Sequence, residues 1–246
     1  MELPDPFRWD GDHVVADLPG ARGLFSTRRG GVSPEPFHSL NLGRLTADAP
    51  ANVDENRTRL AAATGCGRER FLYGRQVHGA SVRRAAAPPS DDRAVTDEDG
   101  QATALAGHPA LVFTADCIPV LLAAGGAVAA IHAGWRGLVA GVLDEGVAAL
   151  REVGGAGEIH ALVGPCARGC CYEVGEEVHA VFEAYDARVG ERNLDLAKVA
   201  SMQLRDAGVE AVHDVGLCSM CWFGLFFSHR RDRGVTGRQA GVVWRV

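Results

Sequence analysis

The sequence predicts a layered α/β sandwich with a mixed β-sheet. Short apolar runs suited to buried strands alternate with longer stretches in which apolar residues recur at every third or fourth position. The order of these segments is not a simple strand–helix–strand repeat, so a Rossmann sheet and a barrel fit less well than a sandwich. No internal repeat is present, and a chain of 246 residues predicts a single domain over residues 1–246.

The first helix is predicted over residues 52–64. Asn52 is placed to cap it, Glu55 stands at the third position of a capping box, and Gly65 is placed to end it. The stretch that follows later, residues 85–100, is rich in Pro, Asp and small residues, which predicts a long loop.

A β-hairpin is predicted around Gly125-Gly126. The apolar runs 110–115 and 118–124 suit buried strands, and another apolar run follows the two glycines. A two-residue turn places Cys117 opposite Gly134 and His132 opposite Pro119. Cys117 and His132 then share one face as diagonal neighbours with Cβ atoms roughly 7 to 8 Å apart. A metal ion with bonds of about 2.0 to 2.3 Å can bridge that gap.

The remaining elements complete the sandwich. Apolar residues at three- and four-residue spacing predict helices over residues 138–153, 174–185 and 196–207. Two further strands are expected at residues 159–163 and 241–244.

Charge and composition exclude several classes of protein. The formal net charge is −6, and no basic block is interleaved with aromatic residues, so nucleic acid is not an expected partner. The N-terminal residues lack the pattern of a signal peptide, and no segment is long enough to span a bilayer, which predicts a soluble cytoplasmic protein without a membrane partner. Lys198 is the only lysine, so a P-loop lysine and most Schiff-base chemistry are excluded.

His78 is the natural third donor for a site built on Cys117 and His132, because polar residues and glycine flank it in the segment RQVHG. The residues alone leave three interpretations open. The three side chains could bind a metal ion, Cys117 and His132 could form a nucleophile and its base, or all could be ordinary buried side chains.

Ordered sequence strings along the whole chain resemble the laccase-domain family. The strings are FSTRRGGVS (25–33), SLNLG (39–43), NVDENRTRL (52–60), RQVHG (75–79), TADCIPVLL (114–122), IHAGWRG (131–137), GPC…CCYEVG (164–175), DL (195–196) and FFSHRRDRGVTGRQAG (226–241). The resemblance implies a zinc site formed by His78, Cys117 and His132. It also implies an α/β sandwich related to the catalytic domain of cytotoxic necrotizing toxins, which work through a Cys and a His.

Members of that family are called polyphenol oxidases or purine nucleoside phosphorylases. The resemblance implies phosphorolysis of adenosine, inosine, guanosine and 5'-methylthioadenosine, together with deamination of adenosine. Three protein ligands leave the fourth position of a zinc ion open, which is typical of a catalytic site. The expected partners are therefore small molecules, namely purine nucleosides and phosphate.

Four residues are candidates for contact with substrate. Arg28 lies in a Gly-rich turn, and Arg136 immediately precedes a predicted helix, so both are placed to bind phosphate. Asn41 and Gln76 could orient the substrate or a metal ligand. Asp116 should point away from the ligands if its strand is regular.

Three alternative functions stay open. A hydrolase could use Cys117 and His132, and a metal-stabilised module could bind ligands without turnover. Copper-dependent polyphenol oxidation is the least favoured, because no His-x-His pair is present to build a multicopper array.

Five further cysteines have no assigned role. Cys218 and Cys221 form a C-x-x-C pair that could build a second, structural zinc site with Cys166, Cys170 and Cys171. Their spacing is irregular, so buried free thiols are the favoured interpretation. The family resemblance also predicts a Tyr at the position occupied by His229.

Overall fold

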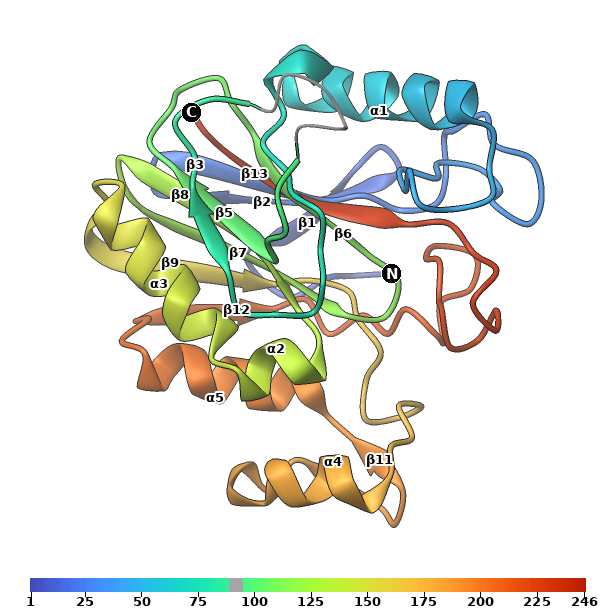
Figure 1. Cartoon of the computed structure of the whole chain (residues 1–246), viewed down its shortest axis with the longest axis vertical. Coiled ribbons are helices and arrows are strands. Elements are labelled where there is room, and N and C mark those ends of the chain that lie inside the picture. The colour runs from blue at the N-terminus through green and yellow to red at the C-terminus, as the bar shows by residue number, and fades with distance from the viewer. Residues whose placement is uncertain (89–94) are drawn as a thin grey trace.

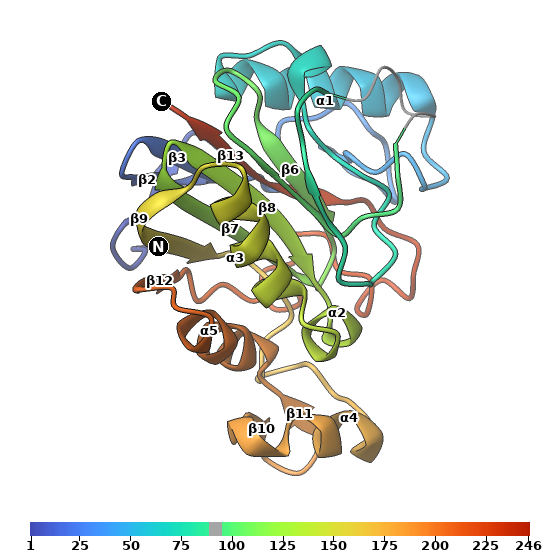
Figure 2. The ribbon, with the colours of Figure 1, turned by 60° about the vertical axis from the view of Figure 1, so that its left-hand side comes forward.

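Two β-sheets pack face to face, and helices cover both outer faces (Figure 1). The computed structural model describes residues 1–88 and 95–246. Helix α1 (Pro50–Thr64) lies over one sheet, whereas α3 (Val142–Glu152) and α5 (Leu196–Asp206) lie over the other (Figure 2). This order of layers confirms the predicted α/β sandwich.

One sheet has five antiparallel strands in the order β1-β2-β3-β13-β6. These strands are β1 (Phe7–Asp10), β2 (His13–Leu18), β3 (Ala21–Phe25), β13 (Gln239–Arg245) and β6 (Ala110–Thr114).

The other sheet has six strands in the order β12-β9-β7-β8-β5-β4. They are β12 (Ala211–Asp214), β9 (Ala156–Val163), β7 (Ile118–Gly125), β8 (Ala127–Ala133), β5 (Gly100–Thr103) and β4 (Val82–Arg84). The outermost pairs, β12 with β9 and β4 with β5, are parallel and the others are antiparallel, so the sheet is mixed as predicted.

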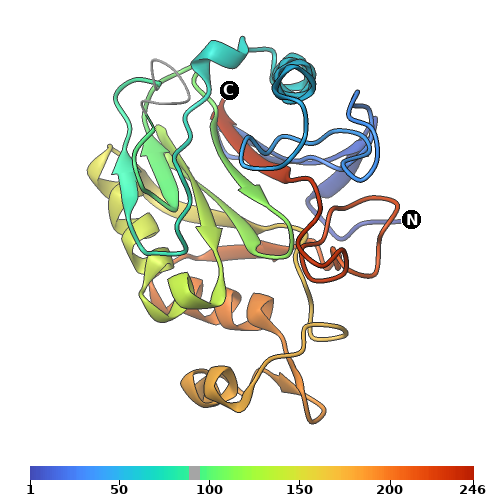
Figure 3. The same ribbon diagram turned by 45° about the vertical axis from the view of Figure 1, so that its right-hand side comes forward.

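The remaining elements are short. They are α2 (Trp135–Val139), α4 (Glu176–Val181), the 3-10 turns η1 (Arg68–Arg70) and η2 (Glu183–Tyr185), and the strands β10 (Arg188–Val189) and β11 (Asn193–Leu194). Helix α4 and the β10–β11 pair project from the sandwich beyond α5 (Figure 3). No helix in the described part of the chain combines the length and apolar character that a membrane crossing requires.

The core lies in layers. Phe25 and Val14 of one sheet meet Leu121 and Leu162 of the other in the space between the sheets, and a second apolar layer lies between the six-stranded sheet and its helices. Strands β7 and β8 are therefore covered on both faces. This double burial explains why their sequences are almost continuously apolar.

The predicted hairpin is confirmed in its turn and in its register. Strand β7 pairs with β8 so that Ile118 lies opposite Ala133 and Pro119 lies opposite His132. Gly126 occupies the turn with φ of 88°, a conformation that glycine adopts without strain.

The predicted cap of α1 is wrong. The helix begins at Pro50, a residue favoured at the first helical position because its ring presets φ. The Asn52 amide donates instead to Asp48 Oδ1 at 3.0 Å, and Glu55 accepts a hydrogen bond from Arg59.

Glycine positions account for two other helix boundaries. Gly65 ends α1 in the left-handed conformation, as predicted. The single helix expected over residues 138–153 is wrong, because Gly141 has φ of 82° and separates α2 from α3. The helix expected over residues 174–185 is also shorter, since only α4 and the turn η2 form there.

The other predicted elements differ from the observed ones by only a few residues at their ends. Helix α5 and strands β9 and β13 match the expected positions to within a few residues. The loop predicted over residues 85–100 ends one residue early because Gly100 belongs to β5, and residues 89–94 lie outside the described part of the chain.

Candidate metal centre

The structure brings His78, Cys117 and His132 together. One donor atom from each lies within 4.8 Å of the other two, and Cys117 Sγ is 3.9 Å from His78 Nε2. The two imidazole rings meet edge to face with centroids 4.9 Å apart. Three donors this close can reach one ion through bonds of about 2.0 to 2.3 Å.

Pairing of β7 with β8 positions two of these donors. Cys117 directly precedes β7, and His132 is the penultimate residue of β8. His132 is only 3% exposed, whereas His78 is exposed in the loop before β4. His78 also has a φ of 62°, which is uncommon for a residue other than glycine.

Asp99 joins the His78 loop to His132. Its fully buried carboxylate accepts hydrogen bonds from the backbone N–H groups of Val77, His78 and Gly79 at 3.3, 2.9 and 2.6 Å. Asp99 Oδ1 also lies 2.8 Å from His132 Nδ1. Because the carboxylate can only accept there, Nδ1 carries the proton and Nε2 is left for a metal ion.

Asp99 was missed in the sequence because it belongs to an acidic run that resembles a solvated loop. Burial opposes its ionisation, but the hydrogen bonds from His132 and from the backbone of Gly79 and His78 outweigh burial and lower the pKa of Asp99 below its ordinary value. The carboxylate is therefore a charged acceptor in the folded chain.

Cys117 and His132 stabilise each other's charged forms. Burial opposes ionisation of the thiol, but the neighbouring charge and hydrogen bonds of His132 and His78 lower the pKa of Cys117 to about 6. Burial likewise opposes protonation of His132, yet Cys117 and Asp99 raise the pKa of the imidazole to about 9. The thiolate is the form in which a cysteine binds a metal ion or acts as a nucleophile.

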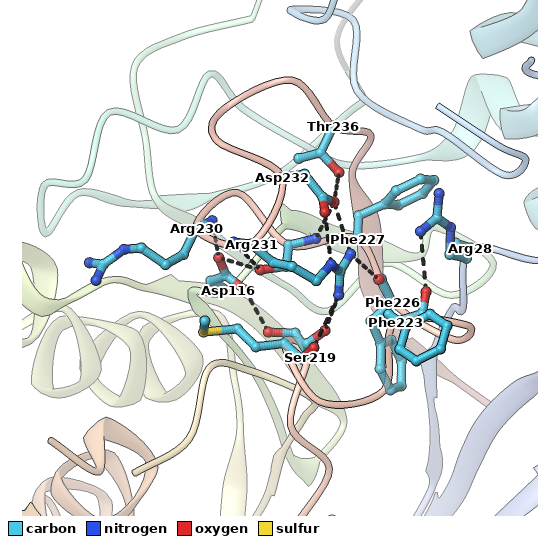
Figure 4. Close-up of polar contacts among 12 residues, drawn as sticks. Arg28, Asp116, Ser219, Phe223, Phe226, Phe227, Arg230, Arg231, Asp232 and Thr236 are labelled. Atoms are coloured by element: carbon cyan, nitrogen blue, oxygen red, sulfur yellow. Dashed lines mark hydrogen bonds and ion pairs between the residues drawn. The ribbon is translucent and has the colours of Figure 1, made fainter. Parts of the chain in front are cut away.

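The chain is not a regular strand at Asp116, so the condition for its side chain to point away from the donors is not met. Strands β6 and β7 belong to different sheets, and Asp116, with φ of 93°, lies in the crossing between them. Its carboxylate accepts hydrogen bonds from Ser219 Oγ and the Arg230 N–H (Figure 4), both at 2.7 Å. It also accepts one from Ser228 Oγ at 3.0 Å. Asp116 thus anchors two loops beside Cys117, and its oxygens are already engaged.

Arg231 fixes the loop over residues 226–238 from within. Its guanidinium donates to the carbonyl oxygen of Ser219 and pairs with Asp232, whose carboxylate also accepts from Thr236 Oγ1 (Figure 4). The side chains of His229, Arg230 and Arg238 in the same loop line a cavity instead.

This cavity of about 590 Å³ contains the three donors in its wall. It is large enough for a small organic ligand. Besides the donors, its wall includes the aromatic residues Tyr73, Phe113, Trp135 and Tyr172 and the arginines Arg44, Arg57, Arg75, Arg136, Arg230 and Arg238. Aromatic rings and cationic groups thus surround the candidate metal centre.

Arg238 is a cavity residue that the sequence did not identify. It is half-buried, and its Nη1 donates to the carbonyl oxygens of Thr236 and Gly237. Burial lowers its pKa although the charges of Cys117 and Asp116 oppose this shift. No carboxylate forms an ion pair with Arg238 among residues 1–88 and 95–246, so an anionic ligand could pair with it.

Two of the four predicted substrate residues line the cavity. Arg136 is exposed there and places its guanidinium 4.3 Å from the centre of the Trp135 ring. The Gln76 amide bonds in both directions with the Phe113 backbone at 2.7 Å, which holds the RQVHG segment against β6.

The other two lie outside the cavity. Asn41 is fully buried, and its carbonyl oxygen accepts from the backbone N–H groups of Gly43 and Arg238. Arg28 lies in a separate hollow, where it donates to the carbonyl oxygen of Phe223. Asn41 therefore supports two segments of the cavity wall, whereas Arg28 contacts the loop over residues 226–238 through the ring of Phe227.

The family model described as multi-copper polyphenol oxidoreductase laccase matches residues 22–246. The purine nucleoside phosphorylase YfiH of Escherichia coli K12 is 39% identical over 246 residues, covering 95% of this chain and 98% of that protein. The purine nucleoside phosphorylase SCO2081 of Streptomyces coelicolor is 42% identical over 236 residues, covering 92% and 96%.

Solved structures share the same architecture. The hypothetical protein YfiH of Bacillus licheniformis superposes with a TM-score of 0.92 at 28% identity, covering 99% of this chain and 100% of that one. YlmD of Geobacillus stearothermophilus superposes with a TM-score of 0.87 at 32% identity, covering 98% and 99%. These two structures agree with the sandwich described above over almost its entire length.

Proposed function

The chain belongs to the family described as multi-copper polyphenol oxidoreductase laccase, and from that premise we propose that it is a zinc-dependent purine nucleoside phosphorylase. The observation that carries the proposal is a single His2Cys donor set in the wall of a cavity that also contains arginines and aromatic rings. Curated relatives of similar length bear the name purine nucleoside phosphorylase.

The donor set fits one zinc ion better than a multicopper centre. Within the described residues, only two groups of three or more His, Cys, Asp or Glu side chains converge, and only the group of His78, Cys117 and His132 contains imidazoles. Multicopper oxidation requires several ions and many imidazoles. Two imidazoles and one thiolate suit a tetrahedral zinc ion with its fourth position open, which would supply Lewis-acid chemistry to a bound oxygen.

The chain's own residues would bind and orient the two substrates. Arg238 and Arg136 are the groups we assign to the phosphate, because guanidinium groups match its charge and geometry. Tyr172 and Phe113 contribute aromatic surface to the cavity wall, which suits a purine. Phosphate held in this way attacks the anomeric carbon of the ribose as the bond to the base breaks, which releases a free purine and a pentose 1-phosphate.

Gln76, Asn41 and Arg28 would act more indirectly. We assign to Gln76 the orientation of the His78 segment, and to Asn41 and Arg28 the support of the loops that carry Arg238. The same cavity would accept inosine, guanosine, adenosine and 5'-methylthioadenosine, and we include hydrolytic deamination of adenosine in the proposed activity.

The test combines metal analysis with product analysis. Wild type should release hypoxanthine from inosine only when phosphate is present, and His78→Ala should lose both this activity and one equivalent of zinc. Cys66→Ser is the matched control, because Cys66 follows α1 and does not line the cavity. Absence of any base release from wild type at saturating phosphate would refute the proposal.

A second candidate function rests on the charged Cys117–His132 pair. A cysteine hydrolase needs such a thiolate and a neighbouring imidazole. This candidate predicts that zinc-free protein retains its activity and that alkylation of Cys117 abolishes it. Loss of activity on zinc removal, with recovery on readdition of zinc, would exclude it.

A further inference from the structure

A second cluster of donor atoms lies outside the cavity and contains only cysteines. Cys170, Cys171, Cys218 and Cys221 are free thiols whose sulfur atoms all lie within 4.8 Å of one another. We propose that these four thiolates bind a second, structural zinc ion. This site is independent of the reaction proposed above.

The sulfur separations fit a single tetrahedral ion. Zinc–sulfur bonds of about 2.3 Å place four thiolates at the corners of a tetrahedron with edges of about 3.8 Å. The separations are 3.0 Å for Cys171–Cys221, 3.4 Å for Cys170–Cys171, 3.6 Å for Cys170–Cys221 and 4.0 Å for Cys171–Cys218. They bracket the expected edge, so one ion can reach all four sulfur atoms with small side-chain adjustments.

Burial argues against the interpretation of these residues as buried free thiols. Cys170 and Cys221 are exposed, Cys171 is half-buried, and only Cys218 is buried. Four thiols that meet partly in solvent contribute little to an apolar core. Exposure of two of them gives an ion a path into the site.

The spacing of two of the thiols also fits a zinc site. Cys218 and Cys221 are the first and last residues of a C-x-x-C turn, and this spacing is typical of cysteine pairs in structural zinc sites. Cys166 is fully buried and stands outside the cluster, so the ligand set is complete with four residues.

The proposed ion would join two loops that are distant in the sequence. Cys171 immediately precedes Tyr172 in the cavity wall, and Ser219, between the other two ligands, donates to Asp116 beside Cys117. A zinc ion here would therefore fix two parts of the cavity wall relative to each other. The ion itself has four protein ligands and no open position, which is typical of a structural site.

Zinc content of purified protein prepared under reducing conditions tests the proposal. Wild type and Cys66→Ser should each contain two zinc ions per chain, whereas Cys221→Ser should contain one. His78→Ala should also retain one zinc ion, because removal of the His78 side chain affects only the His2Cys centre. Replacement of zinc by Co²⁺ in His78→Ala should give strong thiolate-to-cobalt absorption, and the same absorption should be weaker in Cys221→Ser.

Two measurements on wild type avoid dependence on the folding of variants. Titration of the native protein with a mercurial reagent should release two zinc ions, one of them together with modification of four thiols. A total of one zinc ion, lost in His78→Ala and unchanged in Cys221→Ser, would overturn the proposal. Iron in place of zinc at the four cysteines, or a disulfide between any two of them under reducing conditions, would overturn it as well.

Discussion

Replacement of Asp99 by Asn should weaken metal binding without adding or removing a metal ligand. In the structure, Oδ1 accepts from His78 N–H and faces His132 Nδ1, while Oδ2 accepts from the N–H groups of Gly79 and Val77. An asparagine keeps only one of these two acceptors. Its NH2 group must then face donors on the other side, whichever way the amide is turned.

The effect of Asp99→Asn on metal affinity or on stability depends on which carboxylate oxygen is replaced by the NH2 group. If the amide oxygen takes the place of Oδ2, facing the N–H groups of Gly79 and Val77, His132 loses the acceptor that fixes its tautomer. Loss of such a partner weakens metal affinity about 10- to 100-fold, or roughly 1.4 to 2.7 kcal/mol. If the amide keeps its oxygen toward His132, the buried N–H of Gly79 is left unpaired at a cost of about 1 to 3 kcal/mol in stability. Either orientation damages the centre.

Competition with a chromogenic chelator measures the zinc affinity of Asp99→Asn, and thermal unfolding of zinc-free protein measures its stability. Asp97→Asn is the matched control, because Asp97 is two residues away in the same acidic run but forms an exposed ion pair with Arg75. A zinc affinity for Asp99→Asn within threefold of wild type, with an unchanged melting temperature, would refute this account of Asp99.

Four further outcomes are expected. Zinc binding should release one proton from the Cys117–His132 pair between pH 6 and 9, because the thiol is ionised and the imidazole is protonated in that range. The number of protons released should rise below pH 6 and fall to zero above pH 9, which calorimetry in buffers of different ionisation enthalpy measures. Zinc-free protein should lose the stability contributed by the lowered pKa of Cys117 as the pH falls through about 6. It should lose the stability contributed by the raised pKa of His132 as the pH rises through about 9. Melting temperatures measured across this range check both. Arg238→Met should raise the KM for phosphate about tenfold or more, with little effect on the KM for inosine, since a charge-assisted hydrogen bond contributes about 1.5 to 3 kcal/mol; an equal change in both constants would contradict its assignment to phosphate. Gly134→Ala should weaken zinc binding at the His2Cys centre, because the added Cβ would lie 3.1 Å from His78 Cδ2 and 3.2 Å from Cys117 Sγ, so both donor side chains must shift. Gly79→Ala, whose added Cβ would have its nearest atom at 3.5 Å, should match wild type in the same chelator competition.

Local sequence signals were sufficient for the hairpin that carries two of the ligands. The glycine pair marks the turn, and the period of two in a strand then determines which residues lie opposite each other. The pairing of Cys117 with Gly134 and of Pro119 with His132 follows from that register. The polar residues and glycine around His78 made it a candidate third donor, and the resemblance to a family then implied that it is a ligand.

Local sequence signals do not predict contacts between segments that are distant in the sequence. Asp99 binds a loop about twenty residues before it and a strand about thirty residues after it, and nothing in an acidic run distinguishes one buried carboxylate from its exposed neighbours. The four-cysteine cluster depends on the isolated bridge between Cys166 and Cys218, which brings together two loops whose own spacing is irregular. Arg28 shows the opposite error, because a Gly-rich turn with arginine resembles an anion site yet faces a different hollow.

The cavity wall has two parts, and substitutions in one part should disturb the candidate site more than substitutions in the other. Cys117 and His132 adjoin or belong to strands that are covered on both faces, and Asp99 ties His78 to the same scaffold. Arg230 and Tyr172, in contrast, come from loops away from these strands. Substitutions in those loops should therefore change the shape of the cavity without moving the three candidate donor side chains.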